Sequence, residues 1–525
     1  MNRNEMLQQL ESVPEWDIII IGGGATGLGS ALDAASRGYK TLLLEQFDFT
    51  KGTSSRSTKL VHGGVRYLEQ GNIKLVLEAL RERGRLLKNA PHITSAKAFI
   101  LPVYSYWQKI YYGIGLKLYD LLSGKLSLGK TKILSKKKVI ESIPSIQSKN
   151  LRGGILYFDG QFDDSRLAID IASTAVNKGA TVLNYCKVIG FNKKRLPKKQ
   201  EKIIAVKAID QLNNQEYILK CKAVINATGV FTDAVMQMDD HEKHDIVSPS
   251  QGIHLVIDKK YFEGHNALMI PKTSDGRVLF AVPWHDKVVV GTTDTPIKEI
   301  KSEPIALEEE INFIITHFNR YCKTFIEQKD VKAVYAGLRP LVKIKGGGNT
   351  SLLSRDHTII VSKSGLVNIT GGKWTTYRKM AQDAINNAVF SSGLEKRNCI
   401  TQTLSIGKWD LPIDKNNHLH IYGTNANDIN SLMNENILWQ EKIHPDYDYT
   451  KAEVIWFVRK EMAINVEDVL GRRTRLLFLD ANAAIESAPF IAELMMHELK
   501  KDENWKHQQI QLFKQLAKQY LLLNP

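Results

Sequence analysis

The sequence predicts an α/β fold built around a dinucleotide-binding domain. The run from Trp16 to Ile21 is short and almost entirely apolar, and a glycine-rich turn, a helical pattern and a second apolar run follow it. Residues 245–361 contain several runs of alternating apolar positions, and from about residue 406 the spacing becomes mostly helical. We therefore expect a Rossmann-like domain, a domain on an antiparallel sheet and a C-terminal α-helical domain.

The composition bounds the class of protein. A chain of 525 residues is long enough for two or three domains, and an apolar fraction of 43% excludes disordered and fibrous classes. The four cysteines are scattered and include no CxxC pair, which argues against a disulfide framework and against a cysteine-ligated metal site. We expect no bound metal and a reducing compartment.

The charge and the hydropathy suggest where the protein acts. The chain carries 71 basic and 56 acidic residues, a formal net charge of +15, which favours phosphate-rich partners such as nucleic acid, anionic lipid or phosphorylated substrates. It contains no run of 18 apolar residues, and residues 1–15 are too polar for a secretory signal. The sequence therefore predicts a cytoplasmic protein that is free to contact a membrane from that side.

The first motif is the glycine-rich turn. Gly22, Gly24 and Gly27 form the pattern GxGxxG between the predicted strand 16–21 and a predicted helix over residues 25–37. Gly22 allows a tight turn, Gly24 lets a diphosphate approach the backbone, and Gly27 permits close packing of the helix on the strand. The whole pattern predicts a dinucleotide site rather than an ordinary glycine-rich turn.

Later segments favour FAD over a nicotinamide cofactor. The second strand, residues 41–44, ends at Glu45, at the spacing expected for a carboxylate that binds ribose, and a hydroxyl-rich loop follows at residues 53–59. Two further predicted strands end in small residues, at 227–229 and at 371–372. Together with the glycine-rich turn, these make three strand ends that could contact a nucleotide. Three contact segments suit a nucleotide bound in extended form, as FAD is, whereas a nicotinamide enzyme needs only the first.

Five motifs between about residues 16 and 380 carry a family resemblance. They are Ile21–Gly27, Thr53–Glu69, Gly291–Asp294, Ala336–Leu341 and Gly371–Arg378, and residues 59–69 are the most specific part. In these motifs the sequence resembles the FAD-dependent glycerol-3-phosphate dehydrogenases, among the D-amino-acid-oxidase-like flavoproteins. The resemblance implies an FAD-binding domain of that type, oxidation of sn-glycerol 3-phosphate to dihydroxyacetone phosphate by hydride transfer to flavin N5, and a membrane quinone as electron acceptor.

Such a reaction needs a base for the hydroxyl proton and cations for the substrate phosphate. His62 lies in the loop expected beside the flavin, where it acts as the base or only forms hydrogen bonds to backbone or flavin. His254 is the rival base, and the pattern alone allows a structural role for it. Arg339 follows a predicted strand and a glycine, and the resemblance implies that it contacts the substrate and steadies the developing carbonyl oxygen.

The remaining predicted site residues fall into two groups. The substrate group consists of basic, aromatic and hydroxyl side chains, for which surface ion pairs, a plain turn or, for His254, a structural role are the alternatives: Arg66, Tyr67, His254, Thr292, Arg355 and Lys373. The cofactor group is Gly22, Gly24, Gly27, Glu45, Thr53, Ser54, Ser57, Lys59, Leu60, His62, Val188, Ala227, Thr228, Gly229, Gly371, Gly372, Thr375 and Thr376. Thr375 and Thr376 are also expected to cap the helix that they open.

A helical segment within residues 104–138 is a candidate membrane contact. Apolar and aromatic residues recur there at helical spacing, and lysines follow: Trp107, Ile110, Tyr111, Ile114, Leu118 and Leu121, then Lys125, Lys130, Lys132 and Lys136 to Lys138. Such a pattern fits an interfacial helix on an anionic membrane surface. The alternative is a helix that faces the core beside a solvated basic loop.

We divide the chain into four regions. These are a discontinuous FAD-binding domain (1–80, 140–244 and 362–405), a helical and basic insertion (81–139), a substrate-binding domain (245–361) and a C-terminal helical domain (406–525). Within the last region, Arg472, Arg473 and Arg475 are expected to bind phosphates or to face water.

Two alternative functions stay open. One is an oxidase of the same family, which passes its electrons to oxygen and forms hydrogen peroxide. The other is a flavin-containing nucleic-acid binder, which the net charge suggests, although no nucleic-acid-binding motif is present and the basic residues are dispersed. We therefore expect no nucleic-acid partner, and we expect glycerol 3-phosphate, a quinone, an anionic membrane surface and a second copy of the chain in a homodimer.

Overall fold

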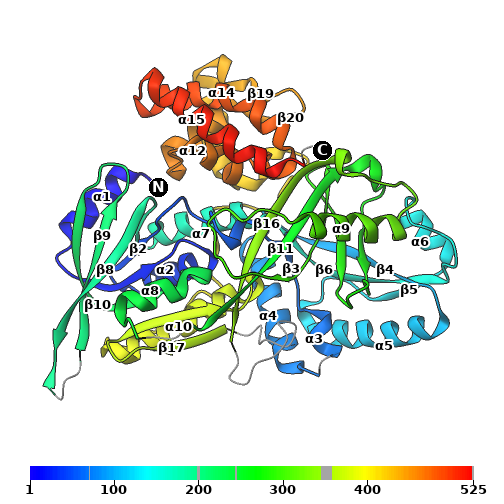
Figure 1. Ribbon diagram of the computed structural model, residues 1–525, viewed down its shortest axis with the longest axis horizontal. Helices are drawn as coiled ribbons and strands as arrows, with labels where there is room; N and C mark the ends of the chain where they lie inside the picture. The colour runs from blue at the N-terminus through cyan, green and yellow to red at the C-terminus, as the bar shows by residue number, and fades with distance from the viewer. Residues whose placement is uncertain (70, 198–200, 243–244, 344–356, 523–525) are drawn as a thin grey trace.

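The computed structural model describes residues 1–69, 71–197, 201–242, 245–343 and 357–522. Two large sheets form its body, and a helical unit covers the place where they meet (Figure 1). The α/β class, with a dinucleotide-binding domain, a largely antiparallel second sheet and a helical C-terminal region, is confirmed.

The first sheet has eight strands. Its main path runs in the order β17-β18-β10-β1-β2-β7: β17 (His357–Val361), β18 (Leu366–Gly371), β10 (Glu216–Asn226), β1 (Trp16–Ile21), β2 (Thr41–Leu44) and β7 (Thr181–Leu183). All of these strands are parallel to their neighbours except β17, and an antiparallel extension is formed by β8 (Cys186–Arg195) and β9 (Glu201–Asp210). β1 is almost wholly buried in the main hydrophobic core, which explains its unbroken run of isoleucines.

The second sheet has ten strands and is mostly antiparallel. Its order is β15-β11-β14-β13-β12-β4-β6-β3, with β16 beside β11 and β5 beside β6. The strands are β3 (Leu60–Val61), β4 (Thr94–Val103), β5 (Lys132–Leu134), β6 (Gly153–Phe162), β11 (Val247–Asp258), β12 (Ala267–Ile270), β13 (Leu279–Trp284), β14 (Lys287–Gly291), β15 (Thr295–Pro296) and β16 (Val331–Val342).

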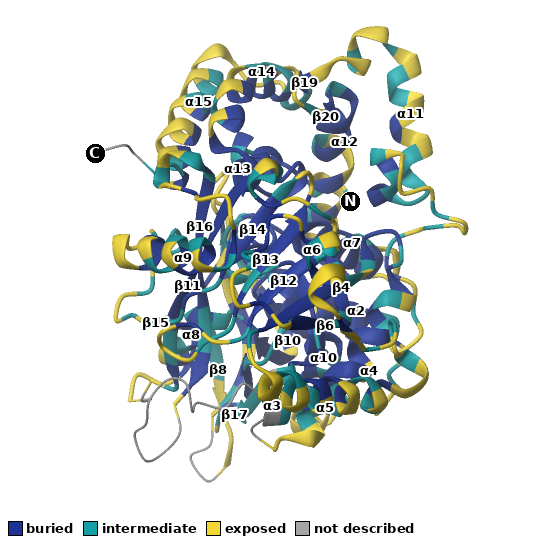
Figure 2. Ribbon diagram, turned by 90° about the vertical axis from the view of Figure 1, so that its right-hand side faces the viewer, coloured by how far each residue is buried: buried dark blue, intermediate teal, exposed yellow. Residues whose placement is uncertain are grey.

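Helices surround both sheets, and exposed residues lie on these helices and on the loops, while the strands inside are largely buried (Figure 2). Around the sheets lie α1 (Arg3–Ser12), α2 (Ala25–Ser36), α3 (Val65–Glu69), α4 (Ile73–Asn89), α5 (Tyr106–Ser123), α6 (Lys136–Ser142), α7 (Asp164–Asn177), α8 (Thr232–Asp239), α9 (Glu308–Tyr321) and α10 (Tyr377–Ser392). The C-terminal unit contains α11 (Asn425–Glu435), α12 (Lys451–Glu461), α13 (Leu476–Leu479), α14 (Ala481–Leu499), α15 (Glu503–Ala517) and the hairpin β19 (Lys442–His444) and β20 (Tyr447–Thr450). No helix within the described ranges is both long and apolar enough to cross a bilayer.

The strand pairing corrects the predicted division of the chain. β4 lies in the segment 81–139, which was expected to be a helical insertion, and β6 lies in a segment assigned to the FAD-binding domain, yet both belong to the second sheet. β17 lies in the predicted substrate domain but pairs with β18 in the first sheet. β4 and β6 were misplaced because their partners lie far apart in the sequence, and a local hydropathy pattern does not show such pairing. β17 was misplaced because the predicted boundary at residue 361 falls between the two strands of one hairpin, β17 and β18. The other boundaries stay predictions.

The arginine run of the C-terminal unit neither faces water nor lies at a phosphate site. Arg472 and Arg473 are buried and both donate to the carboxylate of Asp48, which follows β2. Arg475 donates to Asp164 Oδ1 at 3.0 Å, at the start of α7. Burial of these cations requires paired carboxylates, so the expectation for the run was wrong and its charges join the helical unit to the first domain.

Candidate active site

A cavity of about 1070 Å³ lies between the two sheets. The C-terminal ends of β1, β2, β10 and β18 open into it from the first sheet, and β11 and β16 border it from the second. Ligands of open parallel sheets bind at the carboxyl ends of the strands. The three predicted strand ends, near Gly22, at 227–229 and at 371–372, therefore line the same cavity, although more than 300 residues separate the first from the last.

The glycine-rich turn has the geometry that a dinucleotide needs. Gly22 has a φ of +107°, and a Cβ there would lie 2.8 Å from the carbonyl oxygen of Ala227. A Cβ on Gly27 would collide with the carbonyl oxygen of Gly22, so the helix α2 packs against the turn through this glycine. Gly24 is the N-cap of α2, where free backbone N–H groups and the helix dipole favour a diphosphate.

Glu45 ends β2 beside this turn. Its carboxylate accepts hydrogen bonds from the backbone N–H groups of Gly23, at 2.5 Å, and Phe47, at 2.8 Å. Burial raises the pKa of Glu45, and the two hydrogen bonds counteract this effect. The carboxylate is thus fixed at the cavity wall, where it is able to accept hydrogen bonds from ribose hydroxyls.

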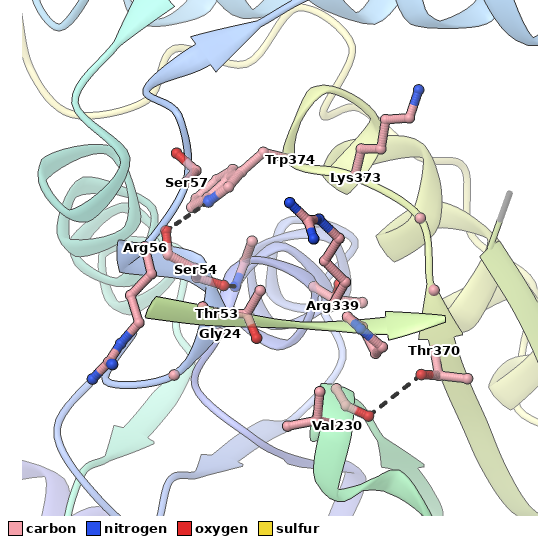
Figure 3. A pocket seen from close by; sticks show the side chains of 18 of the residues that line it. Gly24, Thr53, Ser54, Arg56, Ser57, Val230, Arg339, Thr370, Lys373 and Trp374 are labelled. Carbon is pink, nitrogen blue, oxygen red and sulfur yellow. Dashed lines mark hydrogen bonds between the residues drawn. The ribbon is translucent and has the colours of Figure 1, made fainter. Parts of the chain in front are cut away.

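The hydroxyl-rich loop is held in place from several sides. Ser54 Oγ accepts from the backbone N–H of Ala25 at 2.9 Å, and Trp374 Nε1 donates to Ser54 O at 2.8 Å (Figure 3). Thr53 Oγ1 donates to Leu338 O at 2.6 Å, across the cavity on β16. The loop therefore connects the glycine turn, the start of α10 and the second sheet.

Most of the predicted cofactor residues line this cavity. They are Gly22, Gly24, Glu45, Thr53, Ser54, Ser57, Leu60, His62, Val188, Ala227, Thr228, Gly229, Gly371, Gly372 and Thr375. Gly27 lies behind the turn, as its packing role requires. The open volume, the free N–H groups and the ribose carboxylate together fit a dinucleotide of the size of FAD.

Two of the predicted cofactor residues lie elsewhere. The side chain of Lys59 is fully buried outside the cavity lining, where its Nζ donates to Asp164 Oδ2 at 2.7 Å and to Ser55 O at 2.7 Å. Burial and then Arg475 lower the pKa of Lys59 to about 7, against the attraction of Asp164. Thr376 is the N-cap residue of α10 but makes no side-chain cap, because its Oγ1 donates to Lys373 O at 3.3 Å.

Arg339 lies in the cavity (Figure 3). The turn that follows β14 holds it in place. Its Nη2 donates to Thr292 Oγ1 at 2.9 Å and to Thr293 O at 2.8 Å, and its Nη1 donates to Asp294 Oδ1 at 3.1 Å. A Cβ on Gly252 would occupy the place of the guanidinium, so that position leaves space for it. Thr292 therefore contacts the predicted substrate arginine rather than forming a plain turn.

The two candidate bases differ in their surroundings. His254 is 3% exposed, stacks on Tyr335 with ring centroids 4.9 Å apart, and places its Nε2 2.8 Å from Thr58 Oγ1. Burial, followed by Lys59 and Arg339, lowers the pKa of His254 well below 6.5. His62 is partly exposed to the cavity, and its backbone N–H donates to Thr375 Oγ1 at 3.1 Å.

Tyr67 and Lys373 meet at one side of the cavity. The Nζ of Lys373 lies 3.7 Å from the centroid of the Tyr67 ring, a close cation–π contact. The structure thus brings Tyr67, Thr292, Arg339, Lys373 and both histidines to one cavity. The side chain of Arg66 and the whole of Arg355 lie outside the described residues, so their roles stay predictions.

Sequence reasoning missed several residues of the site. Asp294 and Gly252 position Arg339, and Trp374 holds the loop 53–58. Asp294 and Trp374 lie inside motifs that were recognised, so their positions were available as a signal. Gly252 gave none, because its role depends on a side chain in a neighbouring strand.

Comparison with known proteins identifies the family of this chain. The model of the FAD dependent oxidoreductase family matches residues 17–378, and that of the C-terminal domain of alpha-glycerophosphate oxidase matches residues 363–506. The mitochondrial glycerol-3-phosphate dehydrogenase of Homo sapiens is 41% identical over 540 residues, which cover 97% of this chain and 74% of that protein. The mitochondrial glycerol-3-phosphate dehydrogenase of Arabidopsis thaliana is 37% identical over 548 residues, with 96% and 86% covered.

Solved structures agree as well. The X-ray structure of glycerol-3-phosphate dehydrogenase from Bacillus halodurans, complexed with FAD, matches with a TM-score of 0.80 and 28% identity over 100% of this chain and 99% of that chain. Fold, cavity and matches together define an FAD-dependent oxidoreductase. The chain belongs to the family of FAD-dependent glycerol-3-phosphate dehydrogenases.

Proposed function

We propose that this enzyme oxidises sn-glycerol 3-phosphate to dihydroxyacetone phosphate with FAD and delivers the electrons to a membrane quinone. The observation that carries the proposal is the fixed cation Arg339, which lies in the cavity together with Lys373 and the dinucleotide-binding turn. Relatives that cover nearly the whole chain are named glycerol-3-phosphate dehydrogenases, which supports the same substrate.

The side chains of the cavity have distinct roles in this proposal. FAD, when bound, accepts the hydride equivalent of the alcohol oxidation. His62 accepts the hydroxyl proton, because burial and then two neighbouring cations disfavour the protonated form of His254. Arg339 and Lys373 hold the anionic substrate, with Arg66 and Arg355 as further predicted partners of its phosphate. Tyr67 and Thr292 orient these two cations.

A membrane contact through α5 supports quinone as the acceptor. Six apolar and aromatic side chains that the sequence placed at helical spacing are all exposed on this helix: Trp107, Ile110, Tyr111, Ile114, Leu118 and Leu121. The core-facing alternative is therefore wrong. Exposed lysines follow α5, as an anionic surface requires. The buried side of α5 packs on α3 and α4, which line the cavity through Tyr67 and Leu75.

Anaerobic flavin reduction tests the proposed substrate. Oxidised holoenzyme mixed with sn-glycerol 3-phosphate should lose its flavin absorbance, and a soluble quinone should restore it rapidly. Absence of bleaching would reject the substrate while leaving the flavin fold intact.

The cytoplasmic location and the homodimer stay predictions.

A glycerol-3-phosphate oxidase is the second candidate. Its support is the match of residues 363–506 to the C-terminal domain of alpha-glycerophosphate oxidase. The L-alpha-glycerophosphate oxidase of Mycoplasma pneumoniae shares the fold alone, with a TM-score of 0.57 and 15% identity over 74% of this chain and 97% of that chain. Admission of oxygen to the reduced enzyme separates the two functions, because only an oxidase forms stoichiometric hydrogen peroxide at a rate that matches turnover.

A further inference from the structure

A second cavity, of about 300 Å³, lies outside the active site. It is bordered by the start of β4, the turn between β13 and β14, and residues 415–421 of the C-terminal unit. Among the described residues, none lines both this cavity and the larger one. Its volume is at the lower end of the range for small-molecule sites. We call it the basic cavity.

The lining of the basic cavity is strongly cationic. Four lysines and four histidines line it, against two carboxylates, Asp163 and Asp286. Both carboxylates have cationic neighbours already, since Asp286 lies 3.7 Å from Lys259 and Asp163 lies 3.7 Å from Arg475, which is outside the cavity lining. Lys287 is paired as well, 3.2 Å from Asp258, which lies outside the lining, so the excess positive charge of the lining comes from Lys97 and Lys415.

Two of the lysines bind backbone carbonyl groups rather than carboxylates. Lys97 Nζ donates to Pro283 O at 3.2 Å, and Lys415 Nζ donates to Thr94 O at 3.0 Å. Burial and then Lys259 lower the pKa of Lys97 to about 8, and burial also lowers the pKa of Lys415. These ammonium groups are oriented by the fold, while much of their charge is left uncompensated.

One histidine of the lining has an unused polar atom. His92 is 1% exposed, and its Nε2 lies 2.8 Å from Asp170 Oδ2. Its Nδ1 makes no hydrogen bond to any part of the chain that the structure describes. Because the Asp170 carboxylate accepts from Nε2, Nδ1 is an acceptor, and it is too buried to contact a ligand in the cavity. The side chains that contact a ligand are therefore the lysines.

The charge of the lining decides the class of ligand. No group of three or more His, Cys, Asp or Glu side chains within the described ranges is arranged to hold a metal ion. Phosphate oxygens are strong acceptors for ammonium and imidazole donors. The exposed face of α5 follows the opposite end of β4, so a strand of ten residues separates the basic cavity from the proposed membrane contact. This placement favours a soluble ligand over a lipid headgroup.

We propose that the basic cavity binds a small soluble anion of the phosphate class, with one or two phosphate groups, separately from the substrate. Lys97 contacts the anion from β4, and Lys415 contacts it from the C-terminal unit. This inference does not depend on the proposed function, because its residues lie outside the active site.

Calorimetric titration of the holoenzyme with inorganic pyrophosphate tests the proposal. The Arg339→Gln background weakens binding of the probe in the active site, so that the basic cavity dominates the signal. In that background the added pair Lys97→Gln and Lys415→Gln should weaken binding at least tenfold. The pair Lys178→Gln and Lys501→Gln removes the same charge from exposed positions and should leave the affinity unchanged.

The outcomes are distinguishable. Equal affinity with and without Lys97 and Lys415, or an equal loss in the control pair, would overturn the proposal. A different result is that the protein binds phosphatidic acid vesicles through these two lysines and fails to bind pyrophosphate. That result would overturn the assignment of a soluble ligand. If the double variant fails to fold, Lys415→Gln alone tests the proposal, because the Lys415 side chain is only partly buried. Flavin reduction by glycerol 3-phosphate in the variant with native Arg339 should match the wild type.

Discussion

At the scale of single residues, Arg339 owes its position to three neighbouring strands. β16 carries it, the turn after β14 accepts three of its hydrogen bonds, Gln251 O on β11 accepts a fourth, and Gly252 leaves the space. Its fork of donors is therefore fixed before substrate arrives, which reduces the reorganisation needed when charge develops on the substrate oxygen.

Replacement of Arg339 by lysine tests the need for this fork. A lysine side chain at this position would keep the charge but could not reach Thr292, Thr293 and Asp294 together while facing the substrate. We expect Arg339→Lys to lower kcat/KM for glycerol 3-phosphate at least about tenfold, as the loss of one charged hydrogen bond implies. FAD content should be unchanged. Arg195→Lys, at a side chain 91% exposed, is the matched control, and full activity of Arg339→Lys would reject the assigned role.

The buried His254 predicts a pH dependence of stability. Its folded pKa lies well below 6.5, because of burial and then the charges of Lys59 and Arg339, while the unfolded chain protonates this residue near 6.5. The unfolded state therefore binds more protons as the pH falls below 6.5, and stability declines there by about 1.4 kcal/mol per pH unit until the folded pKa is reached.

His254→Gln removes this titration. The variant should show a smaller fall of Tm between pH 7 and pH 5.5 than the wild type, whatever its Tm at pH 7. His507→Gln, at a largely exposed histidine, should leave the wild-type slope unchanged. Parallel profiles for wild type and His254→Gln would contradict the low folded pKa.

The sequence predicted residues whose roles depend on local geometry. Gly22, Gly24 and Glu45 belong to one unit of strand, turn, helix and strand, so their spacing was sufficient. Lys59 was misassigned because its partner, Asp164, lies 105 residues away and turns the side chain out of the cavity. Gly252 was missed for the same reason, since its role depends on a side chain of β16.

At the scale of elements, α5 has an exposed face of large apolar side chains, which a water-exposed helix normally lacks. Trp107 is 78% exposed and Leu121 is 76% exposed, at opposite ends of the helix. The periodicity predicted the helix correctly. The spacing of apolar residues is the same, however, whether the apolar stripe faces a protein core or a membrane. Only the packing of Tyr119 and Leu116 against the body of the protein tells which side is buried.

This exposed face predicts binding to anionic vesicles. Trp107→Glu combined with Leu121→Glu should reduce the fraction of protein that sediments with phosphatidylserine vesicles at least about tenfold, because both ends of the stripe become charged. Turnover with a soluble quinone should persist, since neither residue lines the cavity. Ile437→Glu, at an apolar residue 71% exposed on the C-terminal unit, is the control. Unchanged sedimentation of the double variant would exclude α5 as the contact.

At the scale of the whole molecule, the helical C-terminal unit takes part in shaping the cofactor loop. Arg475 donates to Asp164 Oδ1 at 3.0 Å and to Ser55 O at 3.1 Å, and Ser57 Oγ donates to Asp164 Oδ2 at 2.7 Å. Lys59 completes this buried cluster from inside the loop. One carboxylate thus serves two cations that come from units far apart in the sequence, which no local pattern in the sequence reveals.

The cluster predicts that a double variant is more stable than one of its single variants. Asp164→Asn leaves Lys59 buried without its carboxylate and Arg475 with Asp163 alone, at 3.7 Å, and we expect a loss of about 3–5 kcal/mol and of bound FAD. Adding Lys59→Met should recover part of both losses. The Lys59 ammonium lies 5.3–5.4 Å from the rings of Trp284, Tyr335 and Phe478, an environment that suits a methionine side chain.

Thermal unfolding and the ratio of flavin to protein absorbance measure both effects. If charge pairing is the cause, the double variant is more stable than Asp164→Asn although it carries one more substitution. A double variant at or below the single one would mean that the hydrogen bonds of Asp164 to Ser57 and Ser165, rather than its charge, organise the loop. In either case the two measurements report on the structure of the loop and not on the catalytic reaction, because neither Asp164 nor Lys59 lines the cavity.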